Sequence, residues 1–132
     1  MKYTVLGGGS WATAIVKILS ENLPEITWYM RNDLAISHIK KYKHNPNYLS
    51  SVELHTNKIH LTSNINEAVA WADYLIFVIP SAFLVSELSK LTVPLKDKVI
   101  FSAIKGIVPE SGLVVGEHLM EAYGINPMNI GV

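Results

Sequence analysis

The chain of 132 residues lacks cysteine, net charge and long apolar segments. The absence of cysteine excludes disulfide bonds and thiolate metal sites. Because 11 basic side chains balance 11 acidic ones, there is no net basic field to favour nucleic acid or an anionic membrane surface as the main partner. The apolar segment 74–79 is far shorter than the roughly 18 residues of a membrane-spanning helix. We therefore expect neither nucleic-acid binding nor membrane insertion.

The N-terminal residues do not have the pattern of a secretory signal, because Gly7, Gly8 and Gly9 interrupt the first apolar segment. We therefore expect a cytoplasmic protein. The histidines do not have metal-ligand spacing with a carboxylate partner. We expect no metal site and place the histidines at the surface or in loops: His38, His44, His55, His60 and His118.

Strand-like and helix-like segments alternate along the chain. Runs of β-branched, aromatic and aliphatic residues predict strands at 2–6, 25–30, 59–62, 74–79 and 98–104, and the start of a sixth at 129–132. Helical spacing of apolar residues predicts helices at 10–22, 33–43, from 64 onward, around 84–91 and at 112–123. In the first helix, we expect the buried face to be formed by Trp11, Ile15, Ile18 and Leu19. This alternation predicts an α/β fold with a doubly wound parallel sheet, in which residues 1–132 form one domain.

A glycine-rich turn follows the first predicted strand and begins the first helix. Its pattern is Gly7-x-Gly9-x-x-Ala12, which in this setting is typical of a dinucleotide-binding fold of the Rossmann type. Gly7 allows the tight turn, Gly9 lets a pyrophosphate approach the backbone, and Ala12 lets the helix pack close to the strand. The free N–H groups at the helix start favour phosphate, and the Ser10 hydroxyl can add a donor. The alternative is a glycine turn in a sheet that binds nothing.

The end of the second predicted strand lacks the acid that NAD-preferring folds use to hold the ribose 2′-hydroxyl. Arg31 stands there instead, between Met30 and Asn32. A guanidinium can pair with a 2′-phosphate, so we predict a site that takes NADP, with NAD left open. The alternative for Arg31 is a solvated charge at the end of a strand.

Two further segments belong at the same edge of the sheet, because ligands bind outside the carboxyl ends of parallel strands. Pro80 and Ser81 end the fourth predicted strand, and Lys105 follows the fifth. The Lys105 ammonium suits a substrate phosphate or a polarised carbonyl oxygen. The alternative is an ordinary exposed lysine.

Five segments, in order along the whole chain, carry a resemblance to a known family. They are 7–14 (GGGSWATA), 28–31 (WYMR), 45–49 (NPNYL), 78–81 (VIPS) and 103–107 (AIKGI). Together they resemble the N-terminal domain of bacterial NAD(P)-dependent glycerol-3-phosphate dehydrogenase. That family continues beyond the sixth strand with a helical domain holding the catalytic lysine, and this chain stops at Val132. We therefore expect no catalytic residue in this chain.

The resemblance implies hydride transfer between sn-glycerol 3-phosphate and dihydroxyacetone phosphate with NAD or NADP, for phospholipid precursor synthesis. It implies that Ser10, Trp11 and Arg31 bind the dinucleotide beside Gly7 and Gly9, with Tyr48 and Pro80 as further cofactor neighbours. Lys105 would contact both cofactor and substrate, a small phosphorylated molecule bound together with the helical domain. A homodimer of the full-length enzyme is left open.

Two other functions are compatible with the same fold. One is the cofactor domain of another two-domain dehydrogenase, acting on a hydroxy acid or on ketopantoate. The other is a stand-alone module that senses NAD(P) and catalyses nothing. The Ser10–Trp11 pair and the 45–49 segment disfavour the first, and the chain end within a predicted strand disfavours the second.

Overall fold

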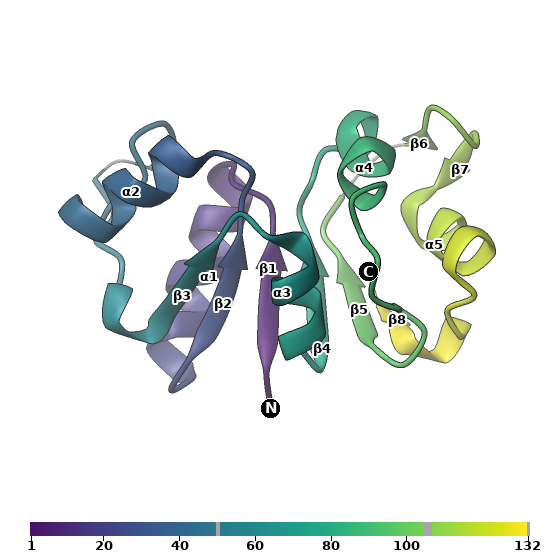
Figure 1. Cartoon of the computed structure of the whole chain (residues 1–132), viewed down its shortest axis with the longest axis horizontal. Helices are drawn as coiled ribbons and strands as arrows, with labels where there is room; N and C mark the ends of the chain where they lie inside the picture. The colour runs from purple at the N-terminus through teal and green to yellow at the C-terminus, as the bar shows by residue number, and fades with distance from the viewer. Residues whose placement is uncertain (50, 105–106, 132) are drawn as a thin grey trace.

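The computed structural model describes residues 1–49, 51–104 and 107–131. Its central sheet has six parallel strands in the order β3-β2-β1-β4-β5-β8 (Figure 1). The strands are β1 (Tyr3–Leu6), β2 (Ile26–Tyr29), β3 (Ile59–Thr62), β4 (Tyr74–Phe77), β5 (Val99–Ser102) and β8 (Ile130–Gly131). This is the strand order of a Rossmann fold, so the predicted doubly wound α/β architecture, including the start of a sixth strand, is confirmed.

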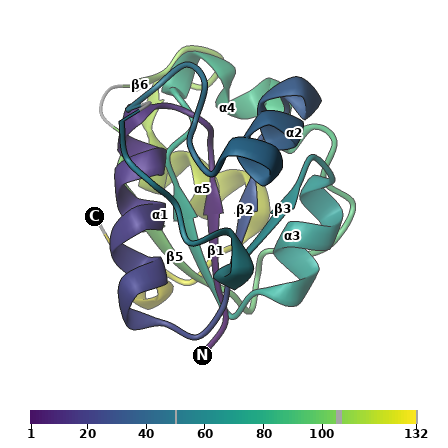
Figure 2. The same ribbon diagram turned by 90° about the vertical axis from the view of Figure 1, so that its left-hand side faces the viewer.

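The helices cover both faces of this sheet. They are α1 (Ser10–Asn22), α2 (Asp33–Tyr42), α3 (Ile65–Trp71), α4 (Ser81–Leu88) and α5 (Val115–Tyr123), with short 3-10 helices η1 (Thr56–Lys58) and η2 (Pro127–Asn129). Val16 of α1 and Ile39 of α2 belong to one core cluster, whereas Ala68 of α3, Leu84 of α4 and Leu119 of α5 belong to the other. Figure 2 shows α1 and α3 on opposite sides of β1. Strands covered on both faces explain the continuous apolar segments of the sequence.

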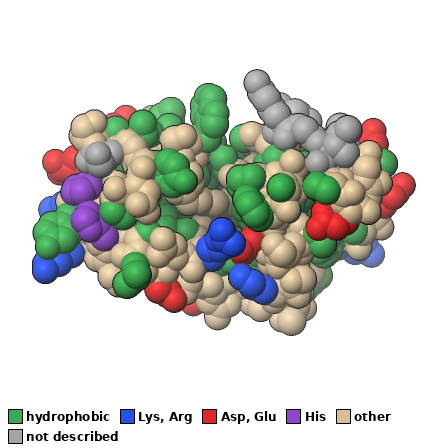
Figure 3. All heavy atoms as spheres, turned by 90° about the horizontal axis from the view of Figure 1, so that it is seen from above, with side chains coloured by type: hydrophobic (Ala, Val, Ile, Leu, Met, Phe, Trp, Pro, Cys, Tyr) green, Lys and Arg blue, Asp and Glu red, His purple; other side chains and the backbone are tan. Residues whose placement is uncertain are grey.

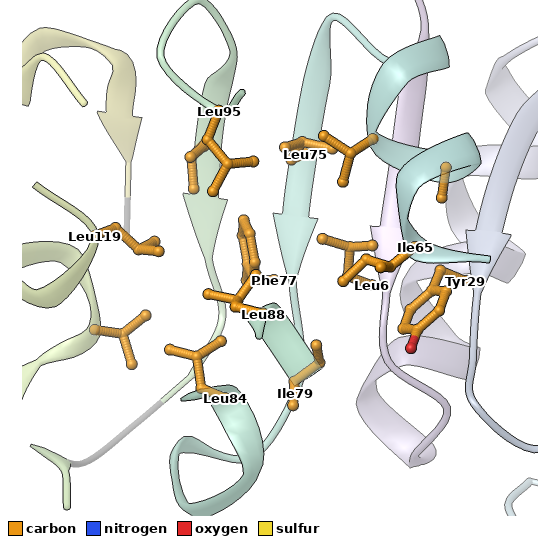
Figure 4. Close-up of a cluster of buried hydrophobic side chains, with 14 of the residues drawn as sticks. Leu6, Tyr29, Ile65, Leu75, Phe77, Ile79, Leu84, Leu88, Leu95 and Leu119 are labelled. Carbon is orange, nitrogen blue, oxygen red and sulfur yellow. The ribbon is translucent and has the colours of Figure 1, made fainter. Parts of the chain in front are cut away.

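The larger core cluster lies between the sheet and α3, α4 and α5 (Figure 4). Leu75 and Phe77 of β4 are fully buried there, in the same cluster as Leu88 of α4. The ring of Tyr29 lies at the edge of this cluster, and its hydroxyl points in the direction of the strand arrows (Figure 4). The core therefore fixes the Tyr29 ring and directs its polar group toward the carboxyl edge of the sheet.

The predicted buried face of the first helix is wrong for Trp11 and Ile18, whereas Ile15 and Leu19 are partly buried and pack against the core. The buried residues of α1 are Ala12, Thr13, Val16 and Ser20. Trp11, by contrast, is 71% exposed and Ile18 is 59% exposed. Small side chains face the sheet because a helix that follows a glycine turn must pack close to the preceding strand. Trp11 and Ile18 are thereby placed outside, and Ile15 and Leu19 lie at the margin of the buried face.

The predicted helix at 112–123 begins too early. Leu113–Val114 forms a short strand, β7, which pairs antiparallel with β6 (Ile107–Val108). Gly112, with a φ of 69°, turns the chain between the two strands, and its N–H donates to the Val108 carbonyl at 2.8 Å. The helix α5 therefore starts at Val115, because the β-branched and aliphatic residues before it find a strand partner.

His38 departs from the predicted placement at the surface or in loops, whereas the half-buried His44 and His55 lie in loops. His38 of α2 is half-buried, and its ring centroid lies 4.7 Å from that of Tyr42 and 4.8 Å from that of His44. Within the described residues, no group of three His, Asp or Glu side chains could hold a metal ion. The His38 ring therefore packs against the rings of Tyr42 and His44.

Candidate functional site

A cleft of about 670 Å³ lies at the carboxyl edge of the sheet. Figure 3 looks onto this edge, where hydrophobic side chains gather and basic and acidic side chains adjoin near the middle. The cleft is lined by the turn after β1, the ends of β2 and β4, the start of α4 and the loop around Tyr48. Ligands of open parallel sheets bind at such an edge, where the strand order reverses. Here that reversal lies at β1, which has β2 on one side and β4 on the other.

Gly7 gives the turn after β1 its shape. Its φ is 136°, and a Cβ added there would lie 2.7 Å from the carbonyl oxygen of Val78. Both the backbone conformation and the close approach to the chain after β4 therefore require glycine. The Gly7 N–H also donates to the Tyr29 carbonyl at 3.0 Å, which ties the turn to the end of β2.

Two buried side chains from other segments donate hydrogen bonds to the backbone of the turn. The Trp28 indole N–H donates to the Gly7 carbonyl at 2.6 Å. The Asn45 amide donates to the Gly8 carbonyl at 3.2 Å and to the Thr13 hydroxyl at 3.0 Å. Both partners come from segments that carry the family resemblance. The carbonyls of Gly7 and Gly8 are thus engaged inside the protein, which reduces their repulsion of an anion in the cleft.

The N-terminus of α1 faces this cleft. Its N-cap residue is Gly9, which provides no side-chain cap, and the backbone hydrogen bonds of the helix start with the Thr13 N–H. A Cβ added at Gly9 would meet no atom within 4 Å. Ser10 is exposed, and Trp11 is 71% exposed. An open glycine before an uncapped helix start is the arrangement that binds pyrophosphate, so these residues fit a dinucleotide.

The end of β2 carries a group of charges shared with α4. The Arg31 side chain is 64% exposed, and its Nη1 lies 3.8 Å from the Glu87 Oε1. The Arg31 guanidinium carbon lies 5.5 Å from the centroid of the Phe83 ring. Lys90 adds a second cation, with Nζ 3.5 Å from the same Glu87 oxygen. Arg31, the cation predicted to bind the cofactor, therefore has an acidic neighbour in Glu87.

Glu87 is itself buried, at 4% exposure, and the Tyr29 hydroxyl donates to its Oε2 at 2.5 Å. Burial raises the pKa of Tyr29, and the hydrogen bond and the charge of Glu87 raise it further. Tyr29 thus stays a hydrogen-bond donor over the whole neutral range and holds the Glu87 carboxylate in place.

The structure brings together all of the described residues that the sequence singled out. The cleft is lined by Gly7, Gly9, Ser10, Trp11, Arg31, Tyr48 and Pro80. Pro80 is the N-cap of α4, and Tyr48 is 47% exposed. Lys105 lies outside the described residues.

Two residues of α4 in this site, Phe83 and Glu87, were not expected from the sequence. Both line the cleft beside Arg31. Glu87 follows Leu84 by three residues and precedes Leu88, so helical spacing puts its charge on the buried face of α4. A charged residue on the buried face of a helix could have indicated this part of the site, because buried carboxylates without a partner are rare.

The strand order, the glycine turn and the cleft define a Rossmann-type dinucleotide-binding domain. Comparison with protein families is more specific. Residues 2–132 match the model of the NAD-dependent glycerol-3-phosphate dehydrogenase N-terminus, and the chain belongs to this family.

Individual relatives agree with the family match. The chain is 38% identical over 119 residues to the glycerol-3-phosphate dehydrogenase [NAD(P)+] of Bacillus subtilis, with 88% of this chain and 34% of the relative covered. It is 34% identical over 122 residues to that of Nitratidesulfovibrio vulgaris, with 92% and 37% covered. The solved structure of Plasmodium falciparum glycerol-3-phosphate dehydrogenase has the same fold, with a TM-score of 0.81 at 24% identity, and the match covers 95% of this chain and 38% of that one.

The chain thus spans about a third of the length of the curated relatives that it matches. The comparisons do not favour a stand-alone sensor or the cofactor domain of another dehydrogenase. Across the described residues, no helix is long and apolar enough to cross a membrane.

Proposed function

We propose that this chain is the NAD(P)-binding part of a glycerol-3-phosphate dehydrogenase, which interconverts sn-glycerol 3-phosphate and dihydroxyacetone phosphate by hydride transfer. The open Gly9 before the uncapped N-terminus of α1 carries the proposal, because it is a ready site for a pyrophosphate. The nicotinamide supplies the hydride chemistry. The residues of this chain bind and orient the dinucleotide. Ser10 and Trp11 bind at its pyrophosphate, and Arg31 binds it farther along the cleft. Tyr48 and Pro80 are further neighbours of the cofactor.

The proposal divides the reaction between two domains. Residues 1–132 supply the cofactor site, and a following helical domain supplies the catalytic lysine and much of the pocket for the phosphorylated substrate. The curated relatives support this division, because the chain covers only 34% and 37% of two of them. Lys105 is proposed to contact both cofactor and substrate. For the full-length enzyme we propose a cytoplasmic location and a role in supplying phospholipid precursors. We also propose that it forms a homodimer.

Titration of the chain with NADH and NADPH tests the cofactor site. Trp11 lies exposed in the cleft, so a bound dinucleotide should quench its fluorescence. The matched control is Trp11→Phe, which should remove most of the fluorescence change while Trp28 and Trp71 remain. The absence of any response up to millimolar concentrations of both cofactors would contradict the proposal.

The division between domains has a separate test. The 132-residue chain should bind cofactor and fail to oxidise glycerol 3-phosphate, because the catalytic lysine is proposed to lie in the helical domain. Absorbance at the NADH band follows the reaction directly. Rapid turnover by this chain alone would refute the division and leave the cofactor site untouched.

A further inference from the structure

The buried carboxylate of Glu87 lines the cleft, and the proposed mode of cofactor binding gives it no role. It is 4% exposed and fixed from three sides. The Tyr29 hydroxyl donates to one oxygen at 2.5 Å, and Arg31 and Lys90 approach the other at 3.8 and 3.5 Å. A carboxylate anchored in this way cannot turn away when a ligand enters.

This carboxylate changes what Arg31 offers to a ligand. A bare guanidinium at the end of β2 would pair with the 2′-phosphate of NADP(H). Here the guanidinium lies near both the Glu87 carboxylate and the Phe83 ring. A phosphate that binds Arg31 must share it with Glu87, and the charge of a buried carboxylate is poorly screened by water and salt.

We propose that Glu87 is a specificity-determining residue that disfavours the 2′-phosphate of NADP(H) and makes NAD(H) the preferred cofactor. The inference rests on the proposed function, because it places the adenosine end of the dinucleotide beside Arg31. The 2′-hydroxyl of NAD(H) is neutral and meets no such repulsion. Glu87 therefore opposes a 2′-phosphate from α4, whereas the acid at the end of β2 in NAD-preferring folds holds the ribose 2′-hydroxyl. Arg31 is not a free phosphate-binding cation.

The test is Glu87→Gln, which removes the charge and keeps an oxygen that can accept the Tyr29 hydroxyl. Dissociation constants for NADH and NADPH are measured by fluorescence titration of the whole chain. The affinity for NADPH should rise about tenfold relative to that for NADH, as expected for the loss of one nearby charge, and the gain should shrink at high salt. Adenosine 2′,5′-bisphosphate and AMP should show the same difference, because they differ only in the 2′-phosphate.

The control variant is Glu121→Gln, which removes the same charge from an exposed position on α5 outside the described lining of the cleft. It should leave the NADPH-to-NADH ratio unchanged. A lower affinity for NADPH in Glu87→Gln would overturn the proposal and show that Glu87 orients Arg31 for the phosphate. An equal change for both cofactors would also overturn it, because a purely structural role affects both alike.

The unchanged chain provides a measurement that does not depend on the folding of a variant. It should bind NADH more tightly than NADPH. Because the charge of Glu87 opposes those of Arg31 and Lys90 at a 2′-phosphate, the ratio of the two affinities should change less than about twofold with salt. A preference for NADPH that falls steeply with salt would mean that Arg31 acts as a bare cation. Binding of neither cofactor would instead refute the proposed function itself.

Discussion

Substitution of alanine for Gly7 or for Gly9 separates what each glycine does in the turn. A Cβ at Gly7 would lie 2.7 Å from the Val78 carbonyl oxygen, and the φ of 136° is unsuited to alanine. The strained backbone costs about 1–3 kcal/mol, and the forced contact costs about the same again. We therefore expect Gly7→Ala to lose about 2–6 kcal/mol of the free energy of unfolding, out of the roughly 5–15 kcal/mol typical of a domain.

Gly9→Ala is the matched variant, with the same atoms added two residues away. Gly9 has a φ of −82° and a ψ of −168°, and a Cβ there meets nothing within 4 Å. The reduced entropy of the unfolded chain and the poorer helix N-cap oppose one another, so the free energy of unfolding should stay within about 1 kcal/mol of that of the unchanged chain. The methyl group occupies the space proposed for the pyrophosphate, so cofactor affinity should fall by at least about tenfold.

Urea unfolding followed by fluorescence of the buried Trp28 measures the stability of both variants, and cofactor titration measures their affinity. Opposite outcomes are expected: Gly7→Ala loses stability, whereas Gly9→Ala loses binding and keeps stability. If Gly7→Ala remained within about 0.5 kcal/mol of the unchanged chain, the reasoning on its backbone would be refuted. If Gly9→Ala bound cofactor normally, the pyrophosphate would lie elsewhere.

Three further predictions concern the surroundings of the turn. Trp28→Phe leaves the buried Gly7 carbonyl without its indole donor and should cost about 1–3 kcal/mol in urea unfolding; an unchanged midpoint would contradict this. Arg31→Ala should weaken NADPH more than NADH in titrations, because only Lys90 then offsets the charge of Glu87; equal weakening would show that Arg31 does not approach that phosphate. Burial raises the pKa of Tyr29 above the 10.0 of the unfolded chain, so stability should be complete below pH 10 and fall as the pH rises above it. Unfolding free energies measured between pH 8 and 11 should show this fall, with a smaller slope in Tyr29→Phe, and equal slopes would refute the assignment.

The sequence was sufficient for the fold class, with its parallel sheet, and for most of the cleft. Continuous apolar strands, helical periodicity and the glycine pattern are local signals, and each reports the environment of its own segment. The same signals failed for α1, where Trp11 and Ile18 set the apparent face while smaller residues are buried. Packing against the sheet decided that face, and a strand partner decided that Leu113–Val114 does not join α5.

Glu87 marks the boundary between what the sequence determined and what only the tertiary structure decided. The sequence by itself determined that an arginine, and no acid, ends the second strand, and it determined the glycine turn that is typical of the fold. Only the fold brings α4 across the end of β2, so that Tyr29 and Arg31 meet a carboxylate that follows them far along the chain. The interaction between two charges depends on their distance in space and not on their separation in the sequence. The electrostatic field around Arg31 is therefore set only when the chain folds.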